Sequence, residues 1–224
     1  MRSYGQFCPI AVGAEIFAER WTPLIVRELF AGSTRFNQLQ RGLPRIPKAT
    51  LTDRLRFLER SGVIERRPDE AGGTRYHLTP AGQDLAAVAV ALGDWARQWG
   101  HAEIGAHNLD PDFLLWDIHR GIVVERLPER RVVARIVLTG AHERHYWLVL
   151  ERPEPSLCLV DPGLEVDLVV TADTVALHRV WVGELDLARA LTTGAIALDG
   201  PAELRRRFPE WLALGFFARR LTAP

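Results

Sequence analysis

Apolar residues recur at helical spacing in five segments of the first hundred residues. A typical segment holds Leu51, Leu55 and Leu58, spaced four and three residues apart, and ends at Ser61-Gly62. After it, "VIERR" and "TRYHLT" are typical of two strands joined by the polar turn "PDEAGG". The pattern predicts helices over residues 9–19, 23–30, 35–43, 48–60 and 80–99, with a hairpin over 63–79 before the last helix.

The pattern changes beyond residue 112. Residues 100–112 lose periodicity and gain Gly, His, Asn and Pro, which indicates a linker. Short β-branched segments then alternate with polar turns, which predicts a meandering antiparallel sheet. Helices follow, with Asp173 and Asp186 as N-caps. The predicted strands are 122–127, 131–140, 145–152, 156–161, 166–172 and 195–200, and the last helix is 201–212.

The helix over 48–60 has a polar face opposite its leucines. Three short helices followed by a basic hairpin are the order of a winged helix-turn-helix. A recognition helix in that fold needs one apolar face for docking and one polar face for base edges. An amphipathic helix with a merely solvated basic face is the alternative, and the order of the elements favours the first interpretation. The predicted DNA-contacting residues are Arg45, Lys48, Ala49, Thr52, Arg56, Arg66, Arg67, Thr74 and Arg75.

Charge supports this assignment only when the chain is divided. The 224 residues carry 28 basic and 28 acidic side chains, so the whole chain is neutral. Residues 1–100 hold fourteen Lys and Arg against ten Asp and Glu, whereas the remainder holds fourteen against eighteen. An anionic partner is therefore expected on the N-terminal half.

Two cysteines are too few for a disulfide framework and indicate a reducing compartment. We find no apolar run of membrane-spanning length and no signal-peptide core. The sequence therefore predicts a cytoplasmic protein with no membrane partner.

Several separated motifs resemble one regulator family. They are Cys8-Pro9, "RWTPLIVRELF", "RFNQLQRGLP", "LTDRLRFLERSGVIERR" and "YHLTPAG". In this order they are similar to the HxlR-type winged-helix regulators, relatives of the MarR group, over about residues 4–100. The resemblance implies a homodimer that binds two-fold-symmetric double-stranded DNA. It also implies that residues 10–17 and 85–99 build the dimer interface, although a stripe at helical spacing can equally be core.

Cys8 precedes a predicted helix N-terminus, where the helix dipole favours the reactive thiolate. The resemblance implies that a cysteine at this place can sense electrophiles or oxidants. A small apolar residue buried in the dimer interface is the alternative. Cys158 lies in a predicted strand and is expected to be inert.

Residues 165–212 resemble the C-terminal part of sterol-carrier-protein-like domains. The resemblance rests on Thr171-Ala172-Asp173, Trp181-x-Gly183, "LARALTTG" and Asp199-Gly200. A sheet covered on one side by helices can enclose an apolar tunnel for a small apolar ligand. A filled core, with a domain used for dimerisation or rigidity, is the alternative. The candidate lining residues are Trp116, Ile136, Leu138, Trp147, Val149, Val170, Leu177, Trp181 and Leu191.

No other chemistry is indicated. His142-x-x-His145 has no third ligand at zinc spacing, and no phosphate loop or serine nucleophile motif is present. We therefore expect no metal, no cofactor and no enzyme activity. The fold class is α+β, with a winged helix over 1–105 and an antiparallel sheet covered by helices, sterol-carrier-like, over 106–224. The expected function is a homodimeric DNA-binding transcriptional repressor that senses an apolar small molecule. A redox regulator that acts through Cys8, with a purely structural second domain, is the alternative.

Overall fold

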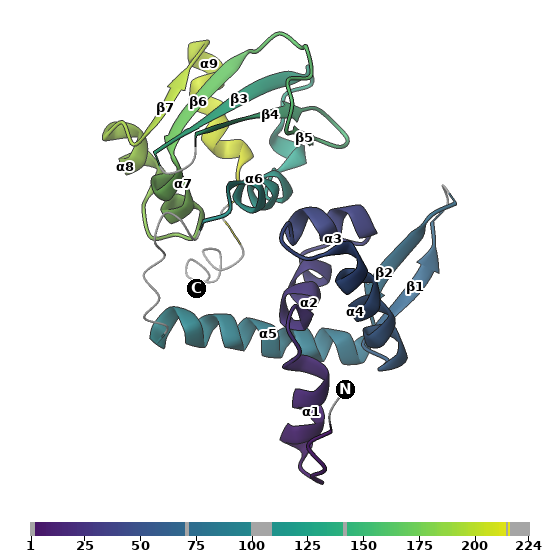
Figure 1. Cartoon of the computed structure of the whole chain (residues 1–224). Helices are drawn as coiled ribbons and strands as arrows, with labels where there is room; N and C mark the ends of the chain where they lie inside the picture. Colours follow the sequence, from purple (N-terminus) through teal and green to yellow (C-terminus); the bar gives the residue numbers. More distant parts are fainter. Residues whose placement is uncertain (1–2, 70–71, 100–108, 141–142, 214, 216–224) are drawn as a thin grey trace. The chain divides into compact units, whose positions relative to one another are not determined.

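The computed structural model describes residues 3–69, 72–99, 109–140, 143–213 and 215 (Figure 1). The chain divides into two compact units, residues 1–102 and 103–224. The boundary predicted after residue 105, and most of the predicted linker, lie outside the described residues.

The first unit has the predicted order of helices and hairpin. Its long last helix runs past the short ones, and its first helix projects from them (Figure 1). The elements are α1 (Pro9–Phe17), α2 (Thr22–Phe30), α3 (Phe36–Gly42), α4 (Lys48–Arg60), β1 (Ile64–Pro68), β2 (Thr74–Leu78) and α5 (Pro80–Trp99).

The core of this unit joins α2, α3, α4 and the base of the hairpin. Ile25, Leu39, Leu51 and Leu58 are fully buried in it. Since these residues come from different helices, their burial fixes α3 and α4 against α2, which is the arrangement of a helix-turn-helix.

A buried carboxylate lies between α2 and α3. Glu28 has no exposed surface, and it accepts hydrogen bonds from Arg27 Nη2 at 2.8 Å and Ser33 Oγ at 3.1 Å. Gly42, at the end of α3, lies against this carboxylate, so a Cβ there would be 1.9 Å from Glu28 Oε2. The glycine is therefore required by close approach.

The second unit is a sheet with helices. Asp173 and Asp186 cap helices as predicted, accepting from Ala176 N and Arg189 N, each at 2.9 Å. The elements are α6 (Pro111–Arg120), the 3₁₀ turn η2 (Val124–Arg126), β3 (Val132–Thr139), β4 (Arg144–Leu150), β5 (Ser156–Cys158), β6 (Leu168–Asp173), α7 (Thr174–Trp181), α8 (Leu187–Thr192), β7 (Ile196–Asp199), α9 (Ala202–Arg207) and the 3₁₀ turn η3 (Phe208–Trp211).

The sheet is mixed, so the prediction of an antiparallel sheet is wrong. Its strand order is β5-β4-β3-β6-β7, and β3 pairs with β6 in parallel, Ile136 opposite Val170. The other neighbours are antiparallel. The reason is the connection over residues 159–167, which returns the chain past two strands to the far side of β3 and places β6 in the same direction as β3.

Two local predictions also fail. Residues 111–120 form α6, which begins within the predicted linker, and Asp110 is its N-cap, accepting from Asp112 N and Phe113 N. Residues 122–127 do not form a strand within a sheet. Instead Ile122 makes an isolated bridge to Leu212, and η2 follows.

The described helices α6, α7, α8 and α9 contribute to a core on one face of the sheet. In β3, β4 and β6 the even-numbered positions, such as Ile136, Leu148 and Val170, face this core because side chains alternate along a strand. The start of α6 is tied to β4 through Asp112, whose Oδ1 accepts from Tyr146 Oη at 2.6 Å and Arg144 Nη1 at 2.7 Å. Burial raises the pKa of Tyr146, and the hydrogen bond to Asp112 raises it further.

Candidate nucleic-acid interface

Helix α4 has the two faces that a recognition helix requires. Leu51, Leu55 and Leu58 are buried against the core. On the other side Lys48, Ala49 and Arg56 are exposed, and Thr52 is half-buried. The exposed side chains can therefore reach an external surface without disturbing the packed face.

The side chains on the polar face of α4 make few strong contacts with the rest of the described chain. Arg56 Nη1 lies 3.9 Å from Asp53 Oδ1, and both side chains are mostly exposed. Thr52 Oγ1 donates to Lys48 O at 2.9 Å and keeps its lone pairs for another donor. Arg45 is exposed on the loop before α4. An exposed arginine in so weak an ion pair can exchange its partner for a base edge or a phosphate at little cost.

The hairpin of β1 and β2 is the predicted wing, but its arginines do not share one face. Arg66 pairs with Tyr76, and Arg67 with Arg75, across the two strands. Side chains alternate along a strand, so Arg67 and Arg75 share one face while Arg66 lies on the other. The three wing arginines predicted to contact DNA are therefore divided between the two faces of the hairpin.

Each wing arginine also has a carboxylate partner. Arg66 Nε donates to Glu59 Oε1 of α4 at 2.8 Å, and this contact raises the pKa of Arg66. Arg67 pairs with Glu65 on its own strand. Arg75 Nε lies 3.2 Å from Asp69 Oδ1. Thr74, the remaining predicted contact, is exposed at the start of β2. Sequence counts of basic residues overstate the free positive charge of the wing.

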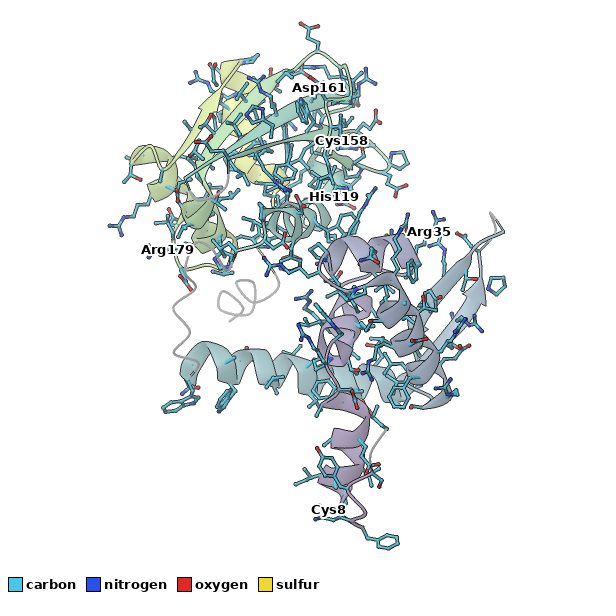
Figure 2. All side chains as sticks on the ribbon, in the orientation of Figure 1. Cys8, Arg35, His119, Cys158, Asp161 and Arg179 are labelled. Atoms are coloured by element: carbon cyan, nitrogen blue, oxygen red, sulfur yellow. The ribbon has the colours of Figure 1, made fainter. Side chains whose placement is uncertain are left out.

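Two residues of this surface were missed by the sequence analysis. Arg35, at the start of α3, places Nη2 2.5 Å from Asp69 Oδ2, and Figure 2 labels it at that end of the helix. Asp69 thus bridges α3 and β2. The sequence "PDEAGG" around Asp69 indicates only a turn. Arg35 and Asp69 are 34 residues apart in the chain, so no local sequence pattern predicts their contact.

An apolar row is exposed on α5. Val88, Leu92, Trp95 and Trp99 are spaced four, three and four residues apart, and about half or more of each side chain is exposed. The same helix buries Ala86 in the core, and Leu85 packs at the core's edge. Leu85 therefore faces the core, and Val88, Leu92, Trp95 and Trp99 face outward. Helix α1 likewise exposes Ile10 and Val12.

Cys8 lies at the N-cap position of α1, with Pro9 as the first helical residue. Its side chain is half-buried, and Figure 2 shows it at the outer end of the helix. Cys158, also half-buried, lies in β5.

The candidate ligand-binding residues of the second unit divide between two faces of the sheet. Six lie in the core between sheet and helices, and Leu191 packs at its edge. Trp147 and Val149 pair with Arg135 and Val133, on the opposite face. The prediction that all nine line one tunnel is therefore wrong for these two, because odd positions of β4 face away from the helices. The six core residues are Trp116, Ile136, Leu138, Val170, Leu177 and Trp181.

Two other expectations concern absences. Among the described residues, no three His, Cys, Asp or Glu side chains are grouped as metal ligands would be. Within the same part of the chain, no helix is both long and apolar enough to cross a membrane.

Comparison with known proteins identifies the first unit. Residues 16–104 match the family described as HxlR-like helix-turn-helix. The chain is similar to an uncharacterized HTH-type transcriptional regulator of Mycobacterium tuberculosis, with 46% identity over 87 residues. These are 38% of this chain and 54% of that protein, so the chain spans about half the length of this relative.

Other relatives are covered almost completely. The uncharacterized HTH-type transcriptional regulator YvaP of Bacillus subtilis is 33% identical over 112 residues, 49% of this chain and 95% of YvaP. Among solved structures, the diamide-treated YodB of Bacillus subtilis is 32% identical, with a TM-score of 0.36, over 42% of this chain and 96% of YodB.

Proposed function

Because the chain belongs to the HxlR-like helix-turn-helix family, we propose that it is a homodimeric DNA-binding transcriptional regulator. The observation that carries the proposal is helix α4, which buries three leucines and exposes Lys48, Ala49 and Arg56 on its free face. We assign the chain a binding role and no catalytic one.

In this proposal α4 enters the major groove and the wing follows the backbone. Arg56 and Lys48 contact base edges, while Arg67 and Arg75 contact phosphates. Arg66 instead holds the wing to α4 through Glu59. The carboxylates of Glu65 and Asp53 compete with DNA for their arginines, so binding exchanges internal ion pairs for contacts with phosphate or base.

We further propose that the second copy docks through the apolar rows of α5 and α1. Exposed tryptophans at helical spacing are typical of protein interfaces and are costly to leave in water. A two-fold dimer would present two α4 helices to half-sites about one helical turn apart.

The second unit is proposed to sense an apolar small molecule between its sheet and its helices, as the sterol-carrier-like resemblance implies. Six of the candidate lining residues lie in the core between the sheet and the helices, where such a ligand would bind. A ligand that prefers one spacing of the two wings would change DNA affinity, and DNA would change ligand affinity by the same factor. Native mass spectrometry of the protein from its own cells tests this part. Extra mass that organic extraction removes supports it, and a bound ligand that leaves DNA affinity unchanged contradicts it.

A redox regulator is the second candidate. The position of Cys8 favours it, because this half-buried free thiol lies at the N-cap of α1. The related YodB has been crystallised in diamide-treated and quinone-bound forms. If Cys8 is the switch, Cys8→Ser abolishes any effect of diamide on DNA binding. An undiminished effect in the variant excludes this candidate, and Cys158→Ser is the matched control.

Salt-dependent duplex binding tests the proposed function. Proteins that neutralise six to ten phosphates lose roughly 10³- to 10⁵-fold in affinity between 50 and 200 mM salt. We expect a steep loss of this kind for the full chain with a fluorescent duplex. A chain that binds no duplex at low salt, or binds without salt dependence, contradicts the proposal.

A further inference from the structure

The turn end of the wing gathers two arginines around one carboxylate. Arg35 Nη2 lies 2.5 Å from Asp69 Oδ2, and Arg75 Nε lies 3.2 Å from Asp69 Oδ1. Each oxygen of the carboxylate therefore has its own arginine. The Asp69 side chain is only 9% exposed, whereas those of Arg35 and Arg75 are 45% and 39% exposed. The carboxylate lies inside, and the guanidinium groups lie outside.

The backbone independently brings the two arginines together. Tyr76 N donates to Thr34 O at 2.7 Å, so β2 is joined to the residue before Arg35. Gln38 Oε1 accepts from Thr34 N at 2.9 Å and from Arg35 N at 3.0 Å, which fixes the start of α3. Asp69 N in turn donates to Gly73 O at 2.8 Å across the turn. Both arginines and the aspartate thus come from backbone that is held in place.

Within the described part of the chain, the pairing with Asp69 leaves further N–H donors on both guanidinium groups. Arg35 uses Nη2 and Arg75 uses Nε for Asp69, and a guanidinium carries five N–H donors. The remaining donors of two adjacent arginines suit the oxygens of one phosphate. Burial raises the pKa of Asp69, but the hydrogen bonds from Arg75 and Arg35 outweigh it, so its pKa is lowered and the side chain is ionised at neutral pH.

We propose that Arg35 and Arg75 form one phosphate-binding site at the turn end of the wing, and that Asp69 is the residue that positions them. The site would take a backbone phosphate of the duplex beside the groove occupied by α4. This inference rests on the proposed DNA binding and adds Arg35 and Asp69 to its surface.

The two possible roles of Asp69, offsetting charge and positioning the arginines, predict opposite effects of Asp69→Asn on DNA affinity. Asp69→Asn removes one negative charge from the DNA-binding surface, so a residue that only offsets charge would give tighter binding when it is replaced. A positioning residue gives weaker binding, because the two guanidinium groups are no longer held side by side. Glu65→Gln is the matched control, since it makes the same change of charge beside a single arginine, Arg67.

The experiment measures affinity for a duplex enriched from a random library by the wild-type chain, at several salt concentrations. We expect Asp69→Asn to weaken binding about five- to tenfold, the size of one lost charge-assisted contact, and Glu65→Gln to leave it equal or tighter. Asp69→Asn is expected to add little in a chain that already carries Arg35→Ala and Arg75→Ala. Thermal unfolding of each variant checks that the fold is kept.

Two results would overturn the inference in different ways. A wild-type chain that binds DNA while Asp69→Asn binds equally well or more tightly refutes the phosphate site alone. A wild-type chain that binds no duplex refutes the proposed function, and the site with it.

Discussion

At the scale of single residues, the exposed arginines of α4 and of the wing are expected to act differently on DNA. Arg56 has a weak ion pair on the face of α4 that would meet base edges, and Arg67 is exposed on the face of the wing that it shares with Arg75. Arg56→Ala should weaken binding to the selected duplex by about 1–3 kcal/mol and leave binding to random DNA nearly unchanged. Arg67→Ala should weaken both alike. Competition titrations measure the two affinities, and equal losses for Arg56→Ala would remove it from base readout.

Gly42 is a residue-scale test of the fold that positions α4. A Cβ at this position would fall within 1.9 Å of the fully buried Glu28 carboxylate, which is already bonded to Arg27 and Ser33. Gly42→Ala should therefore lower the free energy of unfolding by about 1–3 kcal/mol. Gly13→Ala is the control, because a Cβ there meets nothing within 4 Å and alanine favours the helix. Denaturant unfolding measures the free energy of unfolding of both variants, and equal values for the two would contradict the packing described.

At the scale of elements, α5 carries the proposed dimer contact. Trp95 is 60% exposed in the middle of the row formed by Val88, Leu92 and Trp99. Trp95→Glu should raise the dimer dissociation constant at least about 30-fold, since a central tryptophan of an interface is commonly worth 2 kcal/mol or more. Analytical ultracentrifugation measures it. Gln83→Glu, exposed on a different side of α5, should leave the dimer unchanged, and an unchanged dimer in Trp95→Glu would place the interface elsewhere.

An element could be predicted from the sequence when the residues that determine it are close together in the chain. Helix α4 and the wing were predicted because leucine spacing, a glycine stop and paired glycines are short-range patterns. The direction of β6 was not, because it depends on which strand the chain reaches after residue 159. Strand alternation alone predicts that Arg66 lies on the opposite face of the wing from Arg67 and Arg75. A count of basic residues does not separate the two faces. The contact of Arg35 with Asp69 depends on tertiary packing alone.

At the scale of the whole molecule, the family relationship and the charge distribution concern the first unit, whereas the proposed sensor is the second. The family match ends at residue 104, and the surplus of basic residues lies within residues 1–100. We therefore propose DNA binding for the first unit and ligand sensing for the second, and each unit has its own packed core.

The central claim is that two copies of the chain read a symmetric DNA sequence. Its most direct measurement is selection of bound duplexes from a random-sequence library by the full chain, followed by sequencing. We predict an enriched two-fold-symmetric sequence whose half-site centres lie about 10 base pairs, or a multiple of that, apart. No enrichment over a protein-free control would contradict sequence-specific recognition by this protein.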